Sequence, residues 1–201
     1  MAEKRTMSTA SPPTAVVDIG SNSTRLVVYD TSDRSPIAIF NEKLLCGLGR
    51  GLDATGQLSE EGIEQALGAL SRFMRIAQEM GVQRIDMLAT AATRDATNGA
   101  EFVRRASQIS GQEIRVLSGE EEARLSGLGV LSGTPDADGM MGDLGGSSLE
   151  LTPIDHGALG AGQTFALGPQ EAIPPGPWDA DTVCGLIDER LREAGVLIGQ
   201  G

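Results

Sequence analysis

The segment VDIGSNSTRL at residues 17–26 is matched by GDLGGSSLEL at residues 142–151. Asp, Gly, Ser and Leu recur at the same offsets, 125 residues apart. Each copy follows an apolar run and precedes a segment typical of a strand. Recurrence of one supersecondary unit within a chain indicates two domains that are built alike.

Around the first copy, strand-like segments give way to alternating helices and strands. Three short segments rich in β-branched residues are separated by turn residues, which is typical of an antiparallel meander. Apolar residues then recur at helical spacing between Ser59, which can cap a helix, and Gly81, which can end one. The predicted elements are strands at 15–17, 24–29 and 37–43, a helix at 59–80, a strand at 84–89, a helix at 97–110, a strand at 113–117 and a helix at 118–131. This order favours a ribonuclease-H-like α/β layer fold.

Around the second copy, the same strand order begins again and then stops. A stretch rich in Gly, Pro and Asp at 133–139 separates the two copies. The elements predicted beyond it are strands at 140–144, 148–153 and 163–167 and a helix that starts at Asp179 or Asp181 and ends at Glu193. We therefore expect a solvated tail at 1–13, a first domain at 14–132 and a truncated second domain at 133–201.

The composition excludes several classes of protein. Hydrophobic residues make up 40% of the 201-residue chain, which is enough for a packed core, and no apolar run is long enough to span a membrane. The polar N-terminus lacks the apolar segment of a signal peptide, and two cysteines cannot form a disulfide framework, so we expect a reducing, cytoplasmic location. A net charge of −12 argues against nucleic acid as a partner. We expect neither a nucleic-acid nor a membrane partner, and a homodimer is compatible with the sequence.

The two repeated loops have the residue types of a phosphate-binding turn. Glycine lets the backbone approach a ligand closely, and successive N–H groups can point at phosphate oxygens. The candidate phosphate-binding residues in the loops are Gly20, Ser21, Asn22 and Ser23, and Gly145, Gly146, Ser147 and Ser148. A tight hairpin turn uses the same residue types, so one loop alone would not separate the two interpretations. Two matching copies favour phosphate binding.

Four blocks along the chain resemble those of a known family. They are DIGSNSTRL at 18–26, ATAATR at 89–94, SGEEEARL at 118–125 and GDLGGSSLEL at 142–151. In this order they resemble the exopolyphosphatase / guanosine pentaphosphate phosphohydrolase (Ppx/GppA) family, within the actin, sugar-kinase and heat-shock-chaperone superfamily. The resemblance implies duplicated ribonuclease-H-like domains, of which the second copy is incomplete here. The second loop departs from the family pattern, because Ser147 replaces the third of three glycines.

Glu121 is the catalytic candidate that the resemblance implies. Its carboxylate would act as the general base that activates water for attack on a terminal phosphorus. Ser118 and Glu121 also match the capping-box pattern, in which the glutamate accepts a hydrogen bond from the N-cap amide. The resemblance favours catalysis over capping. Glu120 and Glu122 are expected on solvated sides of the helix, because successive helical residues turn by about 100°.

Arg94, Asn98 and three carboxylates complete the expected site. The resemblance implies that Arg94 and Asn98 bind phosphate, and a planar guanidinium suits bidentate contacts of this kind. An ion pair of Arg94 with a neighbouring acid, and a helix-start role for Asn98, stay open as alternatives. The expected ligands of Mg²⁺ or another divalent cation are Asp143, Glu150 and Asp18, because Mg²⁺ takes one or two carboxylates together with substrate phosphates.

The resemblance implies a phosphoanhydride hydrolase. Its substrate would be inorganic polyphosphate, guanosine pentaphosphate of the stringent response, or both, with water as the nucleophile and no covalent intermediate. Two alternatives stay open: an ATP phosphotransferase of the same superfamily, which shares the duplicated loops, and a phosphate or alarmone sensor that binds without turnover. The SGEEEARL block favours the hydrolase.

Overall fold

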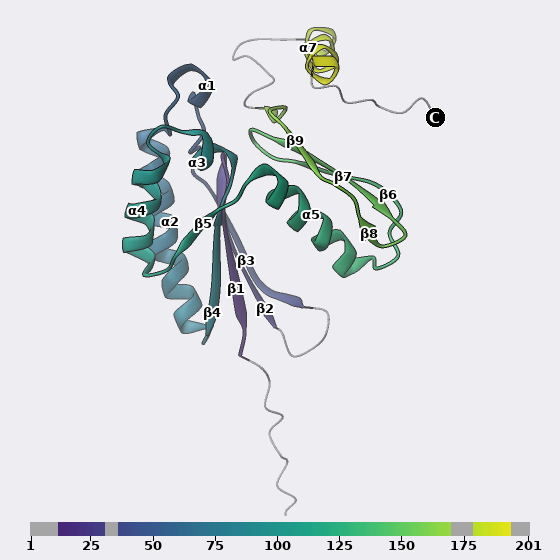
Figure 1. The fold of residues 1–201 in the computed structure, drawn as a ribbon. Helices are drawn as coiled ribbons and strands as arrows, with labels where there is room; N and C mark the ends of the chain where they lie inside the picture. Colours follow the sequence, from purple (N-terminus) through teal and green to yellow (C-terminus); the bar gives the residue numbers. More distant parts are fainter. Residues whose placement is uncertain (1–11, 31–35, 170–178, 194–201) are drawn as a thin grey trace, which may run out of the picture.

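Two β-sheets, each carrying one copy of the repeated loop, organise the chain (Figure 1). The structure is a computed structural model and describes residues 12–30, 36–169 and 179–193. The tail predicted at 1–13 falls almost wholly outside the described residues. The architecture is the duplicated ribonuclease-H-like α/β arrangement that the sequence predicts, with fewer elements described after the second loop than after the first.

The first sheet has five strands in the order β3-β2-β1-β4-β5. They are β1 (Thr14–Ile19), β2 (Ser23–Asp30), β3 (Ile37–Leu45), β4 (Arg84–Ala89) and β5 (Ile114–Val116). β1, β2 and β3 pair antiparallel, which confirms the predicted meander, whereas β4 is parallel to β1 and β5 is parallel to β4. The first repeated loop therefore follows the central strand of the sheet.

Two of the helices cover one face of this sheet, as Figure 1 shows for α2 and α4. The Ser59 hydroxyl accepts a hydrogen bond from the Gly62 N–H at 3.3 Å and caps α2. Phe73 of α2 and Phe102 of α4 are fully buried in the core, so the apolar stripe that predicts each helix is the face that it buries. The described helices are α1 (Leu52–Thr55), α2 (Glu60–Glu79), α3 (Ala91–Asp95), α4 (Gly99–Ser110), α5 (Gly119–Gly133) and α7 (Ala180–Glu193).

The second sheet repeats the strand register of the first. Its strands are β6 (Gly139–Leu144), β7 (Leu149–Asp155), β8 (Ala158–Leu159) and β9 (Gln163–Phe165), and β7 pairs antiparallel with the other three. Asp18 lies opposite Arg25 in the first sheet, and Asp143 lies opposite Glu150 in the second. Because these pairs are offset by the same 125 residues, the duplication holds at the level of single residues.

Helix α5 connects the two sheets. The sequence predicts it as the last element of the first domain, but it packs against β6, β7, β8 and β9 of the second sheet. In Figure 1 it lies between the sheets. Leu125 and Ser126 of α5 line a small hollow together with Leu88 of β4 and Asp143 of β6. The helix can therefore present side chains to both halves of the molecule.

Three short elements, α1, α3 and β8, are absent from the sequence-based expectation. Each has two to five residues, which is too short for an apolar repeat to become visible. The important one is α3, because the ATAATR block folds into it and it carries Arg94. Among the helices that the structure describes, none is long and apolar enough to cross a lipid bilayer.

Candidate functional site

The two repeated loops form the same turn. The Gly20 N–H donates to the Ser23 carbonyl at 2.9 Å, and the Gly145 N–H donates to the Ser148 carbonyl at 2.8 Å. Each loop follows a strand whose penultimate residue is an aspartate, Asp18 in β1 and Asp143 in β6. A Cβ at Gly20 would lie 3.3 Å from the Ser23 carbonyl oxygen, so the residue type suits the closeness of the turn.

Backbone hydrogen bonds from the segment after β3 fix the first loop. The Ser21 carbonyl accepts a hydrogen bond from the Gly49 N–H at 2.8 Å, and the Asn22 carbonyl accepts from the Cys46 and Gly47 N–H groups, both at 2.9 Å. Within the described residues, the N–H groups of Ser21 and Asn22 have no backbone partner outside the strands. A rigid loop with free N–H groups can bind an anion without reorganising.

The two loops line one cleft of about 450 Å³ between the sheets. Ten of the residues predicted from the sequence line it: Asp18, Gly20, Ser21, Asn22, Ser23, Asp143, Gly145, Gly146, Ser148 and Glu150. Both copies of the repeat therefore contribute to a single site. The cleft also has Thr90 of the β4–α3 junction and Glu122 of α5 on its walls.

Acidic side chains from both halves converge on this cleft. Glu150 is 1% exposed, and its Oε1 accepts a hydrogen bond from the Thr164 hydroxyl at 2.8 Å. Asp143 accepts one from the Ser126 hydroxyl at 2.6 Å. The pKa of Asp18 is raised, first because burial disfavours its charged form and second because Asp143 is near. Carboxylates gathered from two strands and partly withdrawn from water are an arrangement that a divalent cation would stabilise.

Glu122, and not Glu121, occupies the cleft. Its side chain is 15% exposed, and its buried Oε2 has no hydrogen-bond partner among the described residues. Burial and the nearby Glu150 raise the pKa of Glu122 to about 7, while Arg94, with its Nη1 3.6 Å from Oε2, opposes the shift. The expectation of a solvated Glu122 is therefore wrong, because the packing of α5 on the second sheet turns this residue inward.

Glu121 completes the capping box at the start of α5. The Ser118 N–H donates to Glu121 Oε2 at 2.9 Å, and the Glu121 N–H donates to the Ser118 hydroxyl at 3.1 Å. The residue is exposed, and hydrogen bonds from Ser118 lower the pKa of its carboxyl. Both hydrogen bonds of the capping box are thus formed in this structure, while the catalytic role of Glu121 stays a prediction.

Arg94 lies between the main cleft and a second hollow. Its guanidinium donates to Asp95 at 2.9 and 3.3 Å and to the Leu117 carbonyl at 3.2 Å, besides the ion pair with Glu122. It lines the second hollow together with Ser147. The guanidinium of Arg94 therefore lies at the edge of the site, and its hydrogen bonds with Asp95 and Leu117 fix its orientation.

Asn98 lies outside both hollows and holds a loop in place. Its Oδ1 accepts from the Leu58 N–H at 2.8 Å, and its Nδ2 donates to the Leu58 carbonyl at 3.3 Å. It makes no side-chain cap at the start of α4. Both ends of the amide are bound to Leu58, and phosphate binding by Asn98 stays a prediction.

Lys43 is a cleft residue that the sequence analysis missed. It lines the main cleft and stands opposite Arg25 in the β2–β3 ladder. Both cations oppose the rise in the pKa of Asp18, which burial and Asp143 cause. The register of the predicted meander could have indicated Lys43, because Asp18, Arg25 and Lys43 lie side by side on three neighbouring strands.

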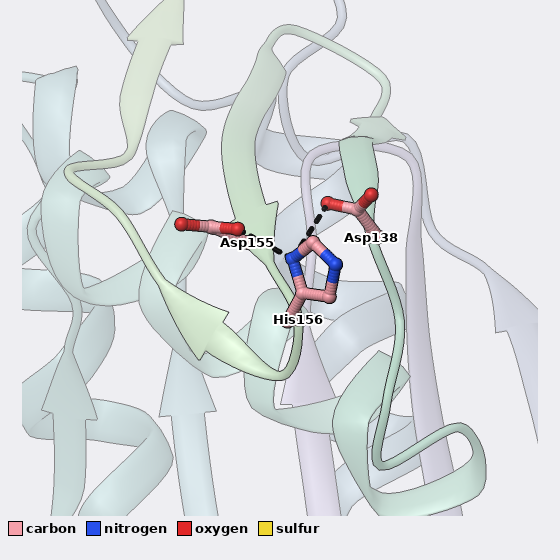
Figure 2. A group of neighbouring side chains, drawn as sticks. All are labelled: Asp138, Asp155 and His156. Carbon is pink, nitrogen blue, oxygen red and sulfur yellow. Dashed lines mark hydrogen bonds and ion pairs between the residues drawn. The ribbon is translucent and has the colours of Figure 1, made fainter.

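A second group of potential metal ligands lies away from the cleft. Figure 2 shows Asp138, Asp155 and His156 close together at the exposed end of the β6–β7 hairpin. His156 Nδ1 is 2.7 Å from Asp155 Oδ1 and 3.8 Å from Asp138 Oδ1. Asp138 directly precedes β6, whereas Asp143 lies near the other end of this strand, five residues further along the chain. This group is separate from the cleft carboxylates.

Comparison with known proteins identifies relatives of this chain. Residues 27–168 match the model of the Ppx/GppA phosphatase family. The chain is 38% identical over 144 residues to a guanosine-5'-triphosphate,3'-diphosphate pyrophosphatase of Vibrio parahaemolyticus and 35% identical over 147 residues to that of Vibrio cholerae. Each match covers 71% of this chain and 29% of the relative, so the chain spans less than a third of the length of these curated relatives.

Solved structures show the same fold. An exopolyphosphatase from Cytophaga hutchinsonii superimposes with a TM-score of 0.81 at 28% identity, covering 90% of this chain and 61% of the other. A Ppx/GppA protein from Aquifex aeolicus gives a TM-score of 0.74 at 26% identity, with the same coverage of both chains. The family model matches more than half of the sequence and includes the second loop of the cleft with Glu122, Asp143 and Glu150, whereas Asp18 and the first loop precede the matched residues. The chain therefore belongs to the Ppx/GppA phosphatase family.

Proposed function

We propose that the cleft hydrolyses phosphoanhydride bonds and releases terminal orthophosphate from inorganic polyphosphate, guanosine pentaphosphate, or both. The observation that carries this proposal is Glu122. Burial raises the pKa of its carboxyl group to about 7, one of its oxygens is buried without a hydrogen-bond partner among the described residues, and it lines the same cleft as the two loops. A general base works best when its pKa is near the working pH.

The two loops would hold the phosphates of the substrate. Free N–H groups at Ser21 and Asn22, and the hydroxyls of the loop serines, supply donors for phosphate oxygens. Lys43 adds a positive charge on the same wall. These groups orient the chain of phosphates so that its terminal phosphorus faces Glu122, and orientation supplies much of the acceleration in phosphoryl transfer.

The chemistry would be a direct displacement by water. Glu122 accepts a proton from the water as the water oxygen forms its bond to the terminal phosphorus. The bond from that phosphorus to the bridging oxygen breaks, and its electrons stay on the shortened phosphate chain. Arg94 keeps Glu122 in place through the ion pair at 3.6 Å. No covalent intermediate with the protein is required.

The carboxylates of the cleft fit a divalent cation such as Mg²⁺. Asp143 and Glu150 each have one oxygen bound by a hydroxyl, from Ser126 and Thr164, which fixes their orientation. Burial first, and repulsion from Asp143 second, raise the pKa of Asp18, and a cation would relieve that repulsion. Asp143 and Glu150, with Asp18 beside them, would hold Mg²⁺, which would neutralise charge on the phosphates.

The proposal is tested by orthophosphate release from long-chain polyphosphate and from guanosine pentaphosphate, with Mg²⁺ and with EDTA. We expect release from at least one substrate that depends on Mg²⁺. Asp143→Asn should lower the rate by at least about 10- to 100-fold, since the loss of even a residue that only supports a metal ligand has an effect of this size. Asp138→Asn, in the exposed group of Figure 2, is the matched control and should leave the rate unchanged.

Two results would overturn this function. One is the absence of Mg²⁺-dependent release from either substrate by the folded protein. The other is release by Asp143→Asn at the wild-type rate, because the acidic cleft would then not be the site of the reaction.

A further inference from the structure

Helix α5 packs against the second sheet through its smallest side chains. Gly119, Ala123 and Gly127 lie four residues apart, which places them along one side of the helix. Ala123 and Gly127 are buried, and a Cβ on Gly127 would lie 2.7 Å from Leu159 Cδ2 of β8. The small residues therefore let the helix lie close to the sheet.

The position of Ala123 in this contact decides which glutamate reaches the cleft. Successive residues of an α-helix are turned by about 100°, so Glu122 is about 100° and Glu121 about 200° from Ala123. Glu122 can thus reach past the edge of the contact into the cleft, while Glu121 faces away from the sheet. The structure agrees, because Glu122 lines the cleft and Glu121 is exposed.

Thr152 of β7 binds the backbone of α5 at this point. Thr152 and Ala123 are both fully buried, and the Thr152 hydroxyl donates to the Ala123 carbonyl at 3.2 Å. Because side chains alternate along a strand, Thr152 lies on the same face of β7 as Glu150, two residues before it. The hydroxyl therefore holds the residue next to Glu122 against the face that carries Glu150.

Gly162 closes the same contact from the other side. A Cβ on Gly162 would lie 2.6 Å from the Cβ of Ala123 and 2.8 Å from the Thr152 hydroxyl oxygen. Glycine and alanine side chains give little resistance to a rotation of the helix about its axis, whereas a hydrogen bond has a preferred direction. The bond from Thr152 is thus suited to fixing the rotation of α5.

We propose that Thr152 is a positioning residue for Glu122. Its hydroxyl fixes the rotation of α5 through Ala123, and Thr152 itself is not among the residues that line the cleft. The inference rests on the proposed function, because it concerns the base of that reaction.

Four charged groups face Glu122 from the surrounding elements. They are Glu150 of β7, Arg94 of α3, Asp18 of β1 and Asp143 of β6. Burial first, and the three acids with it, raise the pKa of Glu122 to about 7, while Arg94 opposes the rise. A rotation of α5 that exposes Glu122 would weaken the effect of burial, so its pKa would fall toward the ordinary value of 4.5.

The test compares two replacements of Thr152. Thr152→Val keeps the branched shape and lacks the hydroxyl, whereas Thr152→Ser keeps the hydroxyl. In Mg²⁺-dependent orthophosphate release, Thr152→Val should lower kcat by about 10- to 100-fold, because a small misplacement of a reacting group has an effect of this size. KM should not change, since the phosphate loops are untouched. Thr152→Ser should stay near the wild-type kcat.

The pKa of Glu122 gives a second readout that requires no turnover. It is measured by NMR titration of the side-chain carboxyl carbon in metal-free buffer. The pKa should be about 7 in the wild type and in Thr152→Ser, and lower in Thr152→Val. The rise of the rate with pH should move to lower pH in Thr152→Val by the same amount, because the base must be deprotonated to act.

Two further variants complete the experiment. Gly162→Ala should push Ala123 away from the sheet and change kcat and the pKa of Glu122 in the same directions as Thr152→Val. Ser110→Ala is the matched control, because Ser110 is also buried and its hydroxyl donates to the Ala106 carbonyl of a helix at 2.8 Å, away from the cleft. It should keep the wild-type kcat and pKa.

The outcomes separate this inference from the proposed function. A wild-type kcat and a wild-type pKa of Glu122 in Thr152→Val would overturn the role of Thr152 and leave the hydrolase standing. Equal losses in Thr152→Val and Thr152→Ser would also overturn it, since the hydroxyl would then not be responsible. Absence of release by the wild type would overturn the proposed function, whereas the titration of Glu122 would still decide whether Thr152 positions this side chain.

Discussion

Glu122 has a carboxyl group whose charged form is disfavoured by its surroundings in the folded protein. Its folded-state pKa of about 7 lies above the ordinary value of 4.5, so the folded state favours the protonated form. The stability gained from this preference is complete below about pH 4.5 and is lost as the pH rises through about 7. Above that pH the buried carboxylate destabilises the fold by up to about 3 kcal/mol in the absence of metal.

Glu122→Gln should therefore stabilise the protein in alkaline, metal-free buffer. The neutral amide should raise the melting temperature at pH 8 by several degrees, at about 2–4 °C per kcal/mol for a chain of this size. At pH 4.5 the gain should vanish, because the glutamate is then protonated. Thermal unfolding of the variant at both pH values, with Glu121→Gln beside it, provides the measurement. The same gain at both pH values would contradict the raised pKa.

The difference between Glu121 and Glu122 marks the limit of sequence reasoning at this scale. Ser118 followed three residues later by Glu121 correctly predicts a capping box, which depends only on local spacing. Which of three consecutive glutamates faces a cleft depends on how α5 is rotated against β6 and β7. That rotation follows from packing between segments distant in sequence, so a linear pattern does not contain it.

The junction between α3 and α4 is the element that places Arg94. A Cβ on Gly99, the first residue of α4, would collide with the carbonyl oxygen of Thr93 in α3. Gly99→Ala should therefore push the two helices apart and destabilise the fold by about 1–3 kcal/mol, as overpacking does. Urea unfolding provides the measurement.

Gly68→Ala is the matched control for this junction. Gly68 lies within α2 and has open space around its Cβ position, so alanine should stabilise the helix by about 0.5–1 kcal/mol. If Gly99→Ala were as stable as the wild type, the close contact between α3 and α4 would not exist as described.

Helices with a long apolar repeat could be predicted, and short helices could not. The sequence predicts α2 at 59–80 and finds its capping serine, because the apolar stripe runs over many turns. It misses α3, whose five residues are held by packing on α4 and by the end of β4. The hydrogen bonds of Asn98 with Leu58 could not be predicted for the same reason, since the two residues lie 40 positions apart in the sequence.

The whole molecule carries a net charge of −12 and gathers four carboxylates in one cleft. Binding of Mg²⁺ there should stabilise the folded state by mass action, since the unfolded chain has no assembled site. We expect millimolar Mg²⁺ to raise the melting temperature, and EDTA to reverse the effect. Glu150→Gln should abolish the Mg²⁺-dependent rise while keeping the hydrogen bond from Thr164.

Asp155→Asn is the control for this measurement, because it removes one acid from the exposed group of Figure 2 instead of the cleft. It should keep the full Mg²⁺-dependent rise. If Asp155→Asn lost the rise and Glu150→Gln kept it, the cation would bind at the hairpin end.

At the scale of the whole molecule, the duplication was the strongest signal in the sequence. It predicts two similar sheets and two matching loops, and the equal offsets of Asp18 with Asp143 and of Arg25 with Glu150 confirm it. Convergence of both loops on one cleft follows from their place at the ends of β1 and β6. The contributions of Lys43 and Glu122 could not be assigned, because they depend on how the sheets and α5 are placed in space.

The central claim is that Glu122, rather than its neighbour Glu121, is the base of the cleft. The most direct test is orthophosphate release with Mg²⁺ from the preferred substrate by Glu122→Gln and Glu121→Gln, each compared with the wild type. The account predicts that Glu122→Gln loses about 100-fold or more of the rate, as expected for a missing general base, while Glu121→Gln stays near the wild-type rate. The reverse pattern, with Glu121→Gln inactive and Glu122→Gln active, would contradict it.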